Sequence, residues 1–321
     1  MIKKVMKKKR KKGISAKRAV ITSTVVDVLD IVINAIVALI TGSVVMIAET
    51  VQGFGDVMAD ISILTGLKQS KKASDRKHPL GHGRSIYFWS FVAGLFLLIV
   101  TASATFYMGL RRFLDPQEIR HISLAFVVLA FFVISNGYSL SVSFRRILGK
   151  KRVRNFIKVF RESSFVETKM TFTSDLIGTF AAIIGLIALG VYQITGDLRF
   201  DGVGAMAIGL TLAAVVLFLL NNIRKFLLGR RASPEIEKKI KKAIVSVKDV
   251  KAVLDLKTVV VGLGKILVNA EISVNKKLTT KKIEKLIDEV KETARKDVPE
   301  VKYIQIEIET PERHVKIRAG K

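Results

Sequence analysis

The sequence contains no cysteine, which excludes disulfide bridges and thiolate metal sites. It also lacks a nucleotide-binding loop, a nucleophile–base pair and a redox motif. Acidic residues are scarce, since 27 Asp and Glu stand against 54 Lys and Arg. These absences argue against a conventional enzyme, and no prosthetic group is expected.

The excess of basic residues gives a formal net charge of +27, which first suggests a nucleic-acid partner. Only 7% of the residues are aromatic, however, and no base-stacking motif accompanies the lysines and arginines. Hydrophobic residues make up 50% of the chain, a combination that fits apolar membrane spans joined by basic loops. We therefore expect a lipid bilayer, and no nucleic acid, as the partner of this chain.

Six segments approach the roughly 20 apolar residues that a helix needs to cross a bilayer. Two connections, residues 68–84 and 145–161, are strongly basic, and the positive-inside tendency places both in the cytoplasm. The lysine-rich start is also expected to be a cytoplasmic tail, and an even number of spans returns the C-terminus to the same side. The sequence thus predicts a polytopic α-helical protein of the plasma or inner membrane. Its expected spans are residues 19–40, 44–67, 86–110, 122–144, 168–192 and 202–222.

The second predicted span carries a polar stripe. The members of this stripe are three or four residues apart and therefore share one helical face. A carboxylate that faces lipid is costly, so this face should lie toward a protein interior or a water-filled cavity. The stripe consists of Glu49, Gln52, Asp56 and Asp60.

The fifth predicted span presents a matching face, formed by Glu167, Thr171 and Asp175 at intervals of four residues. Two helices that each place an acid within the membrane can hold a cation between them, because carboxylate oxygens replace part of its water shell. The simpler interpretation is that both faces only form hydrogen bonds between helices. Two matched acids exceed what such contacts require, and we favour a cation site.

Polar residues also occur in the first predicted span, where Asp27, Asp30 and Asn34 follow at intervals of three and four. Asp27 lies near the cytoplasmic end, so its carboxylate either extends to the membrane surface or takes part in function. Asn34 lies deeper and is expected to form a helix–helix contact more than to bind a ligand.

Beyond residue 231 the pattern changes to short alternating elements. Ser233 and Pro234 are typical of the cap and the first position of a helix. The expected order α-β-β-α-β predicts a small α+β domain with two helices on one face of its sheet. After the helix that Ser233 begins, the elements are strands at 251–261 and 266–274, a helix at 278–297 and a strand at 302–309. The chain should divide into a basic tail at 1–18, a six-helix membrane domain at 19–222, a basic linker at 223–232, the α+β domain at 233–312 and a tail at 313–321.

The loop before the third predicted span contains Asp75, His78 and His82, residue types that can hold a metal ion. Spacing on a loop fixes no geometry by itself. The surrounding His-Pro-Leu-Gly-His-Gly, however, closely resembles the His-Pro-x-Gly-His-Gly signature of the cation diffusion facilitator family. Two further stretches resemble that family, namely Gly-Ser followed by Ala-Glu and an aspartate at 42–56, and Asp201-Gly-x-x-Ala. The resemblance covers about residues 18–312.

The resemblance implies a homodimer with six spans and a ferredoxin-like cytoplasmic domain that exchanges a divalent metal, as substrate, for protons. The transport site of the family lies on its second and fifth spans. Its positions correspond here to Gln52 and Asp56 on one span and to Thr171 and Asp175 on the other. Both acids of the family pattern are present, and both first positions, His or Asp in the family, are changed.

A second site of the family, on the loop, corresponds to Asp75, His78 and His82. Some members also hold a metal cluster in the cytoplasmic domain. That cluster finds no histidine here, because His314 lies in the tail.

The changed positions affect the expected chemistry. Zn²⁺ prefers imidazole or thiolate ligands, whereas a site made only of oxygen suits Mn²⁺, Mg²⁺, Ca²⁺ or Fe²⁺. Without histidine, two close acids can still share a proton when no metal is bound. Proton coupling would then use Asp56 and Asp175, or Glu49 and Glu167 as a relay.

Three functions remain open from the sequence. We favour proton-coupled efflux of a divalent cation such as Zn²⁺, Mn²⁺ or Fe²⁺ by a dimeric antiporter. The changes at Gln52 and Thr171 also fit a transport-inactive member that senses metal or acts as a scaffold. A third possibility is a carrier that uses the same acids for a different cation.

Overall fold

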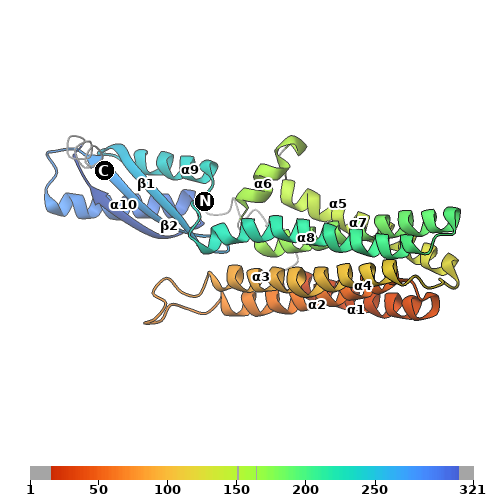
Figure 1. Ribbon diagram of the computed structural model, residues 1–321. Helices are drawn as coiled ribbons and strands as arrows, with labels where there is room; N and C mark the ends of the chain where they lie inside the picture. Colours follow the sequence, from red (N-terminus) through yellow and green to blue (C-terminus); the bar gives the residue numbers. More distant parts are fainter. Residues whose placement is uncertain (1–15, 150–151, 164, 311–321) are drawn as a thin grey trace, which may run out of the picture. The chain divides into compact units, whose positions relative to one another are not determined.

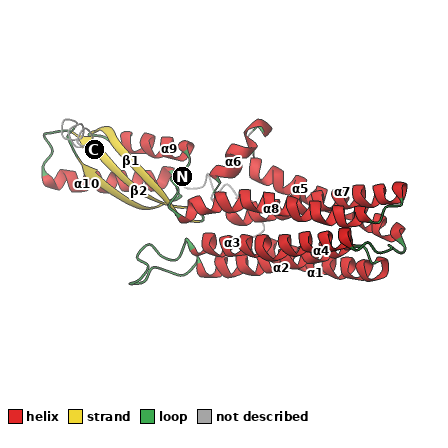
Figure 2. Cartoon of the chain, viewed as in Figure 1, coloured by secondary structure: helices red, strands yellow, loops and turns green. Residues whose placement is uncertain are grey.

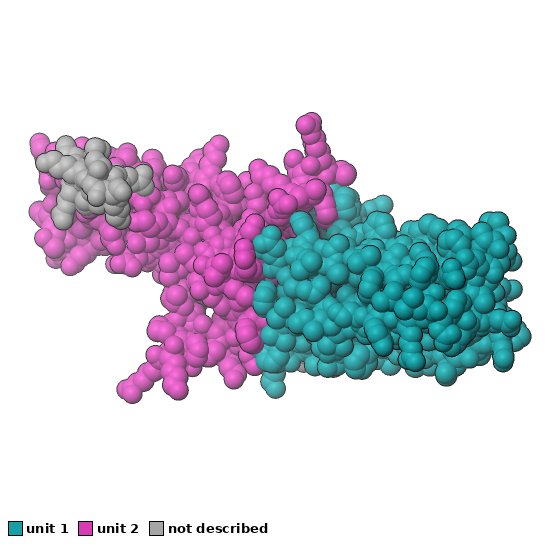
Figure 3. All heavy atoms as spheres, in the orientation of Figure 1, with its two compact units in different colours: residues 1–68, 89–149, 167–221 teal, residues 69–88, 150–166, 222–321 magenta. Residues whose placement is uncertain are grey.

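The computed structural model describes residues 16–149, 152–163 and 165–310. Most of the tail predicted at 1–18, and all of the tail predicted at 313–321 with His314, lie outside the described residues. The chain forms two compact units, which Figure 3 colours separately. The first unit comprises residues 1–68, 89–149 and 167–221, and the second comprises residues 69–88, 150–166 and 222–321.

The first unit is built from long helices (Figures 1 and 2). Among the described residues, four helical stretches are long and apolar enough to cross a membrane, at 85–114, 122–148, 166–195 and 199–227. Two more helices, α1 and α2, have 26 residues each but carry several acids. The helices are α1 (Ala16–Thr41), α2 (Val44–Gln69), α3 (Ser85–Phe96), η1 (Leu97–Ala102), α4 (Ser103–Leu114), α5 (Ile122–Leu148), α7 (Val166–Thr195) and α8 (Arg199–Leu227).

The third predicted span is not a regular helix. Its middle, η1, is π-helical and joins α3 to α4 without a break. This segment lies against Gly55 of α2, where a Cβ atom would come within 2.5 Å of Thr101 Oγ1 and 2.8 Å of Leu97 Cδ2. The wider turn of the π-helix therefore lies next to the polar stripe of α2. Such π-helical turns are frequent at functional sites.

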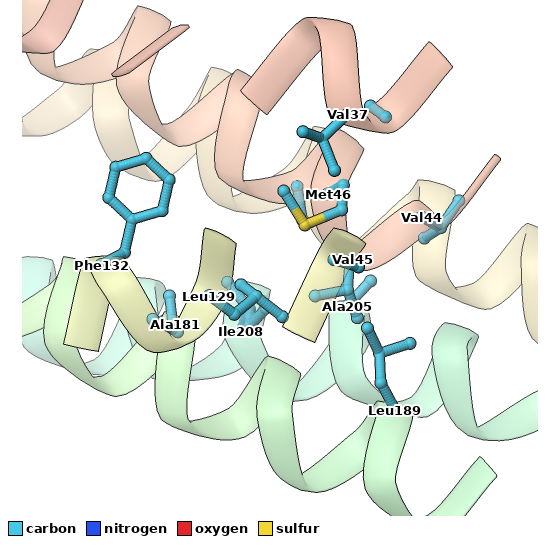
Figure 4. Packing of buried hydrophobic residues seen from close by; sticks show 14 of the residues in the cluster. Val37, Val44, Val45, Met46, Leu129, Phe132, Ala181, Leu189, Ala205 and Ile208 are labelled. Carbon is cyan, nitrogen blue, oxygen red and sulfur yellow. The ribbon is translucent and has the colours of Figure 1, made fainter. Parts of the chain in front are cut away.

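An apolar cluster holds the first unit together next to the polar stripe (Figure 4). Val45 and Met46 of α2, fully buried, pack with Leu129 of α5, Leu189 of α7 and Ile208 of α8. These α2 residues precede Glu49 by about one turn. The cluster therefore closes one end of the polar interior with side chains that cannot bind a cation.

The helices α4 and α8 approach each other through small residues. A Cβ atom at Gly109 would lie 2.6 Å from the backbone nitrogen of Met206, and one at Gly202 would lie 2.6 Å from the carbonyl oxygen of Gly109. Such small-residue contacts are typical of membrane helices, where close backbone packing replaces the hydrophobic driving force.

The end of the chain folds as the predicted α-β-β-α-β unit (Figure 2). Ser233 caps the first helix, accepting a hydrogen bond from the amide of Ile236 at 3.4 Å, and Pro234 is the first helical residue, as predicted. The sheet has the order β1-β2-β3, with β1 and β2 antiparallel and β2 and β3 parallel. Both helices share one core with β2. The elements are α9 (Pro234–Val245), β1 (Val250–Gly262), β2 (Lys265–Val274), α10 (Thr280–Asp297) and β3 (Val301–Ile308).

The segment predicted as a linker at 223–232 is partly helical, because α8 continues to Leu227. Its last residues are attached to β1, since the amide of Ala232 donates to Thr258 Oγ1 at 3.0 Å. Arg231 binds Glu237 through two hydrogen bonds. Burial tends to raise the pKa of Glu237, but the hydrogen bonds from Arg231 and Thr258 hold that pKa below its usual range.

Two shorter elements, η2 (Val153–Asn155) and α6 (Phe156–Glu162), also belong to the second unit. Within this unit the Tyr87 and Phe226 rings are stacked with their centroids 5.2 Å apart. The start of α3 and the end of α8 are therefore packed together.

Candidate metal centres

The helices α1 and α2 run antiparallel with a register that two contacts define. Thr24 Oγ1 donates a hydrogen bond to Asp60 Oδ2 at 2.8 Å. Further along, a Cβ atom at Gly53 would lie 2.7 Å from Ile31 Cγ1. This register places Asp27 level with Asp56. The acids of the first span therefore belong to the same polar interior as the stripe of α2.

Two small cavities lie in this interior. Cavity A, of about 40 Å³, is lined by polar residues of α1, α2 and α7 and by apolar residues of α2, η1 and α7. Cavity B, of about 50 Å³, extends toward Glu49 and is also lined by α5. Asp27, Asp56, Ser174 and Asp175 line both cavities. Cavity A adds Asp60, Thr171 and Thr173, and cavity B adds Asp30, Asn34, Glu49, Gln52 and Asn136.

Hydroxyl groups orient the two shared acids of α2 and α7. Asp56 accepts a hydrogen bond from the side chain of Ser174. Asp175 accepts one hydrogen bond on each carboxylate oxygen, from Ser139 at 2.8 Å and from Ser143 at 2.6 Å. Both serines belong to α5, in which the sequence predicted no site residue. Asn136, Ser139 and Ser143 follow one another at intervals of three and four residues, so they share one face of the helix. This interval in the sequence could have identified the polar face of α5.

The four predicted transport-site residues do not all line the same cavity. Asp56 and Asp175 line both cavities. Thr171 lines only cavity A, and its hydroxyl donates to the carbonyl oxygen of Glu167 at 3.1 Å. Gln52 lines only cavity B. The two aspartates are therefore the members of this set that face one common space.

The two predicted relay acids also differ. Glu49 lines cavity B and is 5% exposed. Glu167 is among the lining residues of neither cavity, and its Oε2 atom is buried without a hydrogen-bond partner. The geometry connects Glu49, and not Glu167, with the space that Asp56 and Asp175 share.

The loop residues Asp75, His78 and His82 come together as the sequence suggests. Each offers one ligand atom, and these atoms lie within 4.8 Å of one another. No other set of three His, Asp or Glu residues in the described part of the chain meets this condition. His82 Nδ1 lies 3.2 Å from the carbonyl oxygen of Ala73. A carbonyl accepts only, so Nδ1 carries the proton and Nε2 is left for a metal.

Local hydrogen bonds also order this loop. Asp75 Oδ1 accepts from the amide of His78 at 2.6 Å and lies 3.1 Å from His78 Nδ1. Slight desolvation tends to raise the pKa of Asp75, but these hydrogen bonds keep that pKa below its usual range. The carboxylate is therefore available to a cation, and the donor set fits a metal such as Zn²⁺.

The loop is attached to the α+β domain within the second unit. A Cβ atom at Gly83 would clash with the carbonyl oxygen of Val261 and lie 3.2 Å from the Cα atom of Gly262. Tyr303 of β3 donates a hydrogen bond from its hydroxyl to the carbonyl oxygen of Leu80 at 3.2 Å. The metal-ligand loop thus packs on the hairpin of β1 and β2 and on β3.

Two family models match most of the chain. A model described as a cation efflux transmembrane domain matches residues 20–228. A model described as the cytoplasmic domain of a cation efflux protein matches residues 232–311.

Curated relatives carry names of metal transporters. The chain is 27% identical over 243 residues to the human protein named proton-coupled zinc antiporter SLC30A9, mitochondrial, covering 75% of this chain and 43% of that protein. It is 25% identical to metal tolerance protein C4 of Arabidopsis thaliana, over 73% of this chain and 52% of that protein. The chain therefore spans about half the length of these two relatives. It is 20% identical to the manganese efflux system protein MneP of Bacillus subtilis, over 84% of this chain and 88% of that protein.

Proposed function

Because the chain belongs to the cation diffusion facilitator family of metal transporters, we propose that it exports a divalent cation from the cytoplasm in exchange for protons. The observation that carries this proposal is the placement of Asp56 and Asp175. These acids come from two different helices, line the same two cavities and are oriented by hydroxyl groups. Two carboxylates at one space balance the charge of a dication.

The ligand set favours a hard cation. The polar side chains that line the cavities offer hydroxyl, amide and carboxylate oxygens, and no imidazole or thiolate lines them. Oxygen ligands suit Mn²⁺ and Fe²⁺ better than Zn²⁺. The cation proposed as substrate is therefore of the Mn²⁺ class, although the relatives bear names of both zinc and manganese transporters.

Exchange for protons follows from the same acids. When no metal is bound, two neighbouring carboxylates repel each other, and a shared proton relieves the repulsion. Binding of a dication displaces that proton. Glu49, at cavity B, is the acid that we propose as the relay to the opposite side.

The proposed assembly is a homodimer of six-span subunits with a ferredoxin-like domain in the cytoplasm. The α-β-β-α-β order and the parallel pairing of β2 with β3 support the ferredoxin-like assignment. The loop charges support cytoplasmic termini and a location in the plasma or inner membrane. The domain limits proposed are 19–222, 223–232 and 233–312. The loop site of Asp75, His78 and His82 is proposed to bind metal separately from transport.

Ion uptake into vesicles tests the function. The purified protein is reconstituted, and entry of Mn²⁺, Fe²⁺, Zn²⁺, Mg²⁺ and Na⁺ is measured with and without a proton gradient. We expect uptake of Mn²⁺ or Fe²⁺ that increases with the gradient. Uptake of no ion would support the transport-inactive interpretation, and uptake of Na⁺ alone would support a carrier for another cation.

A further inference from the structure

Three buried oxygen atoms of residues that line cavity B have no hydrogen-bond partner among the described residues. They are Asn34 Oδ1, Glu49 Oε1 and Gln52 Oε1. The three residues are only 3%, 5% and 4% exposed, and all of them line cavity B. A buried acceptor without a donor is unfavourable, and native proteins rarely leave one unexplained. Three at one cavity indicate that its contents supply positive charge or hydrogen-bond donors.

The helix register brings these oxygens together. Thr24 meets Asp60, and Ile31 meets Gly53, so α1 and α2 pass each other in opposite directions. Continued along both helices, this register places Asn34 level with the turn of α2 that holds Glu49. The orphaned oxygens therefore come from two helices that face each other across cavity B.

We infer that cavity B is a second binding site for a hard divalent cation, held by the oxygens of Asn34, Glu49 and Gln52. This inference rests on the proposed function, because it gives the transported cation a second position beyond Asp56 and Asp175. Asp30 also lines cavity B, so that Asp30 and Glu49 together balance the charge of a dication.

The size and the lining of cavity B fit a cation better than a neutral ligand. Its volume of about 50 Å³ holds an ion and a water molecule, since one water needs only about 10–15 Å³ by this measure. Five carboxylates line it, and no lysine or arginine does so among the described residues. The ligands are all oxygen, as Mn²⁺ and Mg²⁺ prefer.

The position of the second site suggests its role. Glu49 precedes Asp56 by seven residues, about 10 Å along α2. Because Asp27, Asp56, Ser174 and Asp175 border both cavities, a cation can pass from the shared aspartates into cavity B without crossing an apolar layer. Two dications at this spacing repel each other, so that arrival of one promotes release of the other.

Counting bound Mn²⁺ tests the second site. The full-length protein in detergent carries His78→Ala and His82→Ala, which remove the loop site, and equilibrium dialysis measures ions per chain. We expect two ions in this background and one after Asn34→Leu or Glu49→Gln. Asn34→Asp, which keeps a side-chain oxygen, should retain two. Asp56→Asn should also leave one ion, and adding Asn34→Leu to it should leave none.

A matched control uses Thr105, whose buried hydroxyl oxygen also has no hydrogen-bond partner but whose residue lines neither cavity. Thr105→Val should keep two ions. A count of one ion in the background protein, or a count of two that both Asn34→Leu and Glu49→Gln leave unchanged, overturns the second site. The proposed function fails in a different way, namely when the same protein moves no cation into vesicles whatever the number of ions it binds.

Discussion

Ser43 donates a hydrogen bond to Asp201 over 2.6 Å, although the two residues are 158 positions apart in the chain. Asp201 is fully buried and also accepts from the amides of Val44 at 2.7 Å and Val45 at 3.1 Å. It thereby places a carboxylate at the N-terminus of α2, where the helix dipole favours negative charge. Two stretches resemble the family pattern, namely Gly-Ser at 42–43 and Asp201-Gly. The hydrogen bond between Ser43 and Asp201 shows that these two stretches contact each other. Its role is to fix the start of the helix that carries Glu49 and Asp56.

Removing the charge of Asp201 should destabilise the protein. In Asp201→Asn one carboxylate oxygen becomes an NH2 group, whose hydrogens then point at the amide of Val44 or of Val45, itself a donor. We expect a loss of about 1–3 kcal/mol in the free energy of unfolding, the usual cost of a buried group left unsatisfied. Thermal or chemical unfolding in detergent measures the loss. The control is Glu118→Gln, which changes an exposed acid of the same end of the first unit. Equal stability of both variants would show that Asp201 does not anchor α2.

Asp56→Asn and Asp175→Asn should each reduce transport to background. Each substitution keeps the shape of the side chain but removes one of the two charges that balance a dication at the shared space. Vesicle uptake measures transport, and size-exclusion chromatography verifies that the variants are folded. Glu118→Gln, exposed and outside both cavities, should transport normally. Normal uptake by both aspartate variants would exclude this pair as the transport site.

His78→Ala combined with His82→Ala should lower the number of Zn²⁺ ions bound per chain by one without abolishing transport. The ligand atoms of these residues and Asp75 lie within 4.8 Å of one another, and imidazole suits Zn²⁺. His121→Asn is a matched control, because asparagine tolerates the left-handed backbone at φ 46°. An unchanged Zn²⁺ count in the double variant would mean that the motif only orders the loop.

The loop site should also lose Zn²⁺ as the pH falls. Metal binding requires ring nitrogens that carry no proton, so protons compete with Zn²⁺ for both imidazoles. The hydrogen bonds from His78 hold the pKa of Asp75 below its usual range, so this carboxylate stays ionised while protons compete for the imidazoles. Calorimetric titrations of the wild-type chain between about pH 5.5 and 7.5 should show affinity rising with pH. Affinity that is constant over this range would place the ion on carboxylates instead.

Thr171→His should raise the affinity for Zn²⁺ relative to that for Mn²⁺. The new imidazole would stand one turn from Asp175 at cavity A and add nitrogen to an oxygen shell, which favours Zn²⁺. Competition binding in detergent measures the ratio. Thr195→His adds an imidazole to the exposed end of the same helix and should leave the ratio unchanged. If Thr171→His binds both ions with the original ratio, position 171 does not face the metal.

Gly83→Ala should detach the loop from the α+β domain. A methyl group there would meet the backbone of Val261 and Gly262, which cannot move as a side chain would. We expect faster proteolysis within residues 69–84 and weaker Zn²⁺ binding by the loop. Gly190→Ala is the control, because a Cβ atom at Gly190 would meet nothing within 4 Å. Proteolysis at the same rate in both variants would show that the contact of Gly83 does not hold the loop.

The sequence alone determined the elements and the chemistry of their faces. Apolar length predicted helices such as α5 and α8 to within a few residues, and alternation predicted β3. Intervals of three and four residues placed Glu49, Gln52 and Asp56 on one face of α2. Local periodicity carries this information because side-chain direction repeats with the turn of the helix or the pleat of the strand.

Only the tertiary structure decided which faces meet. Periodicity orients the polar side of α5 but does not name its neighbour, so the hydrogen bonds from Ser139 and Ser143 to Asp175 became visible only in the folded chain. The same holds for Gln52 and Thr171, which the family pattern puts in one site and the packed helices put at different cavities. Such pairings depend on helix register and on close backbone contacts such as that of Gly53 with Ile31. These are properties of two segments together, and neither segment encodes them by itself.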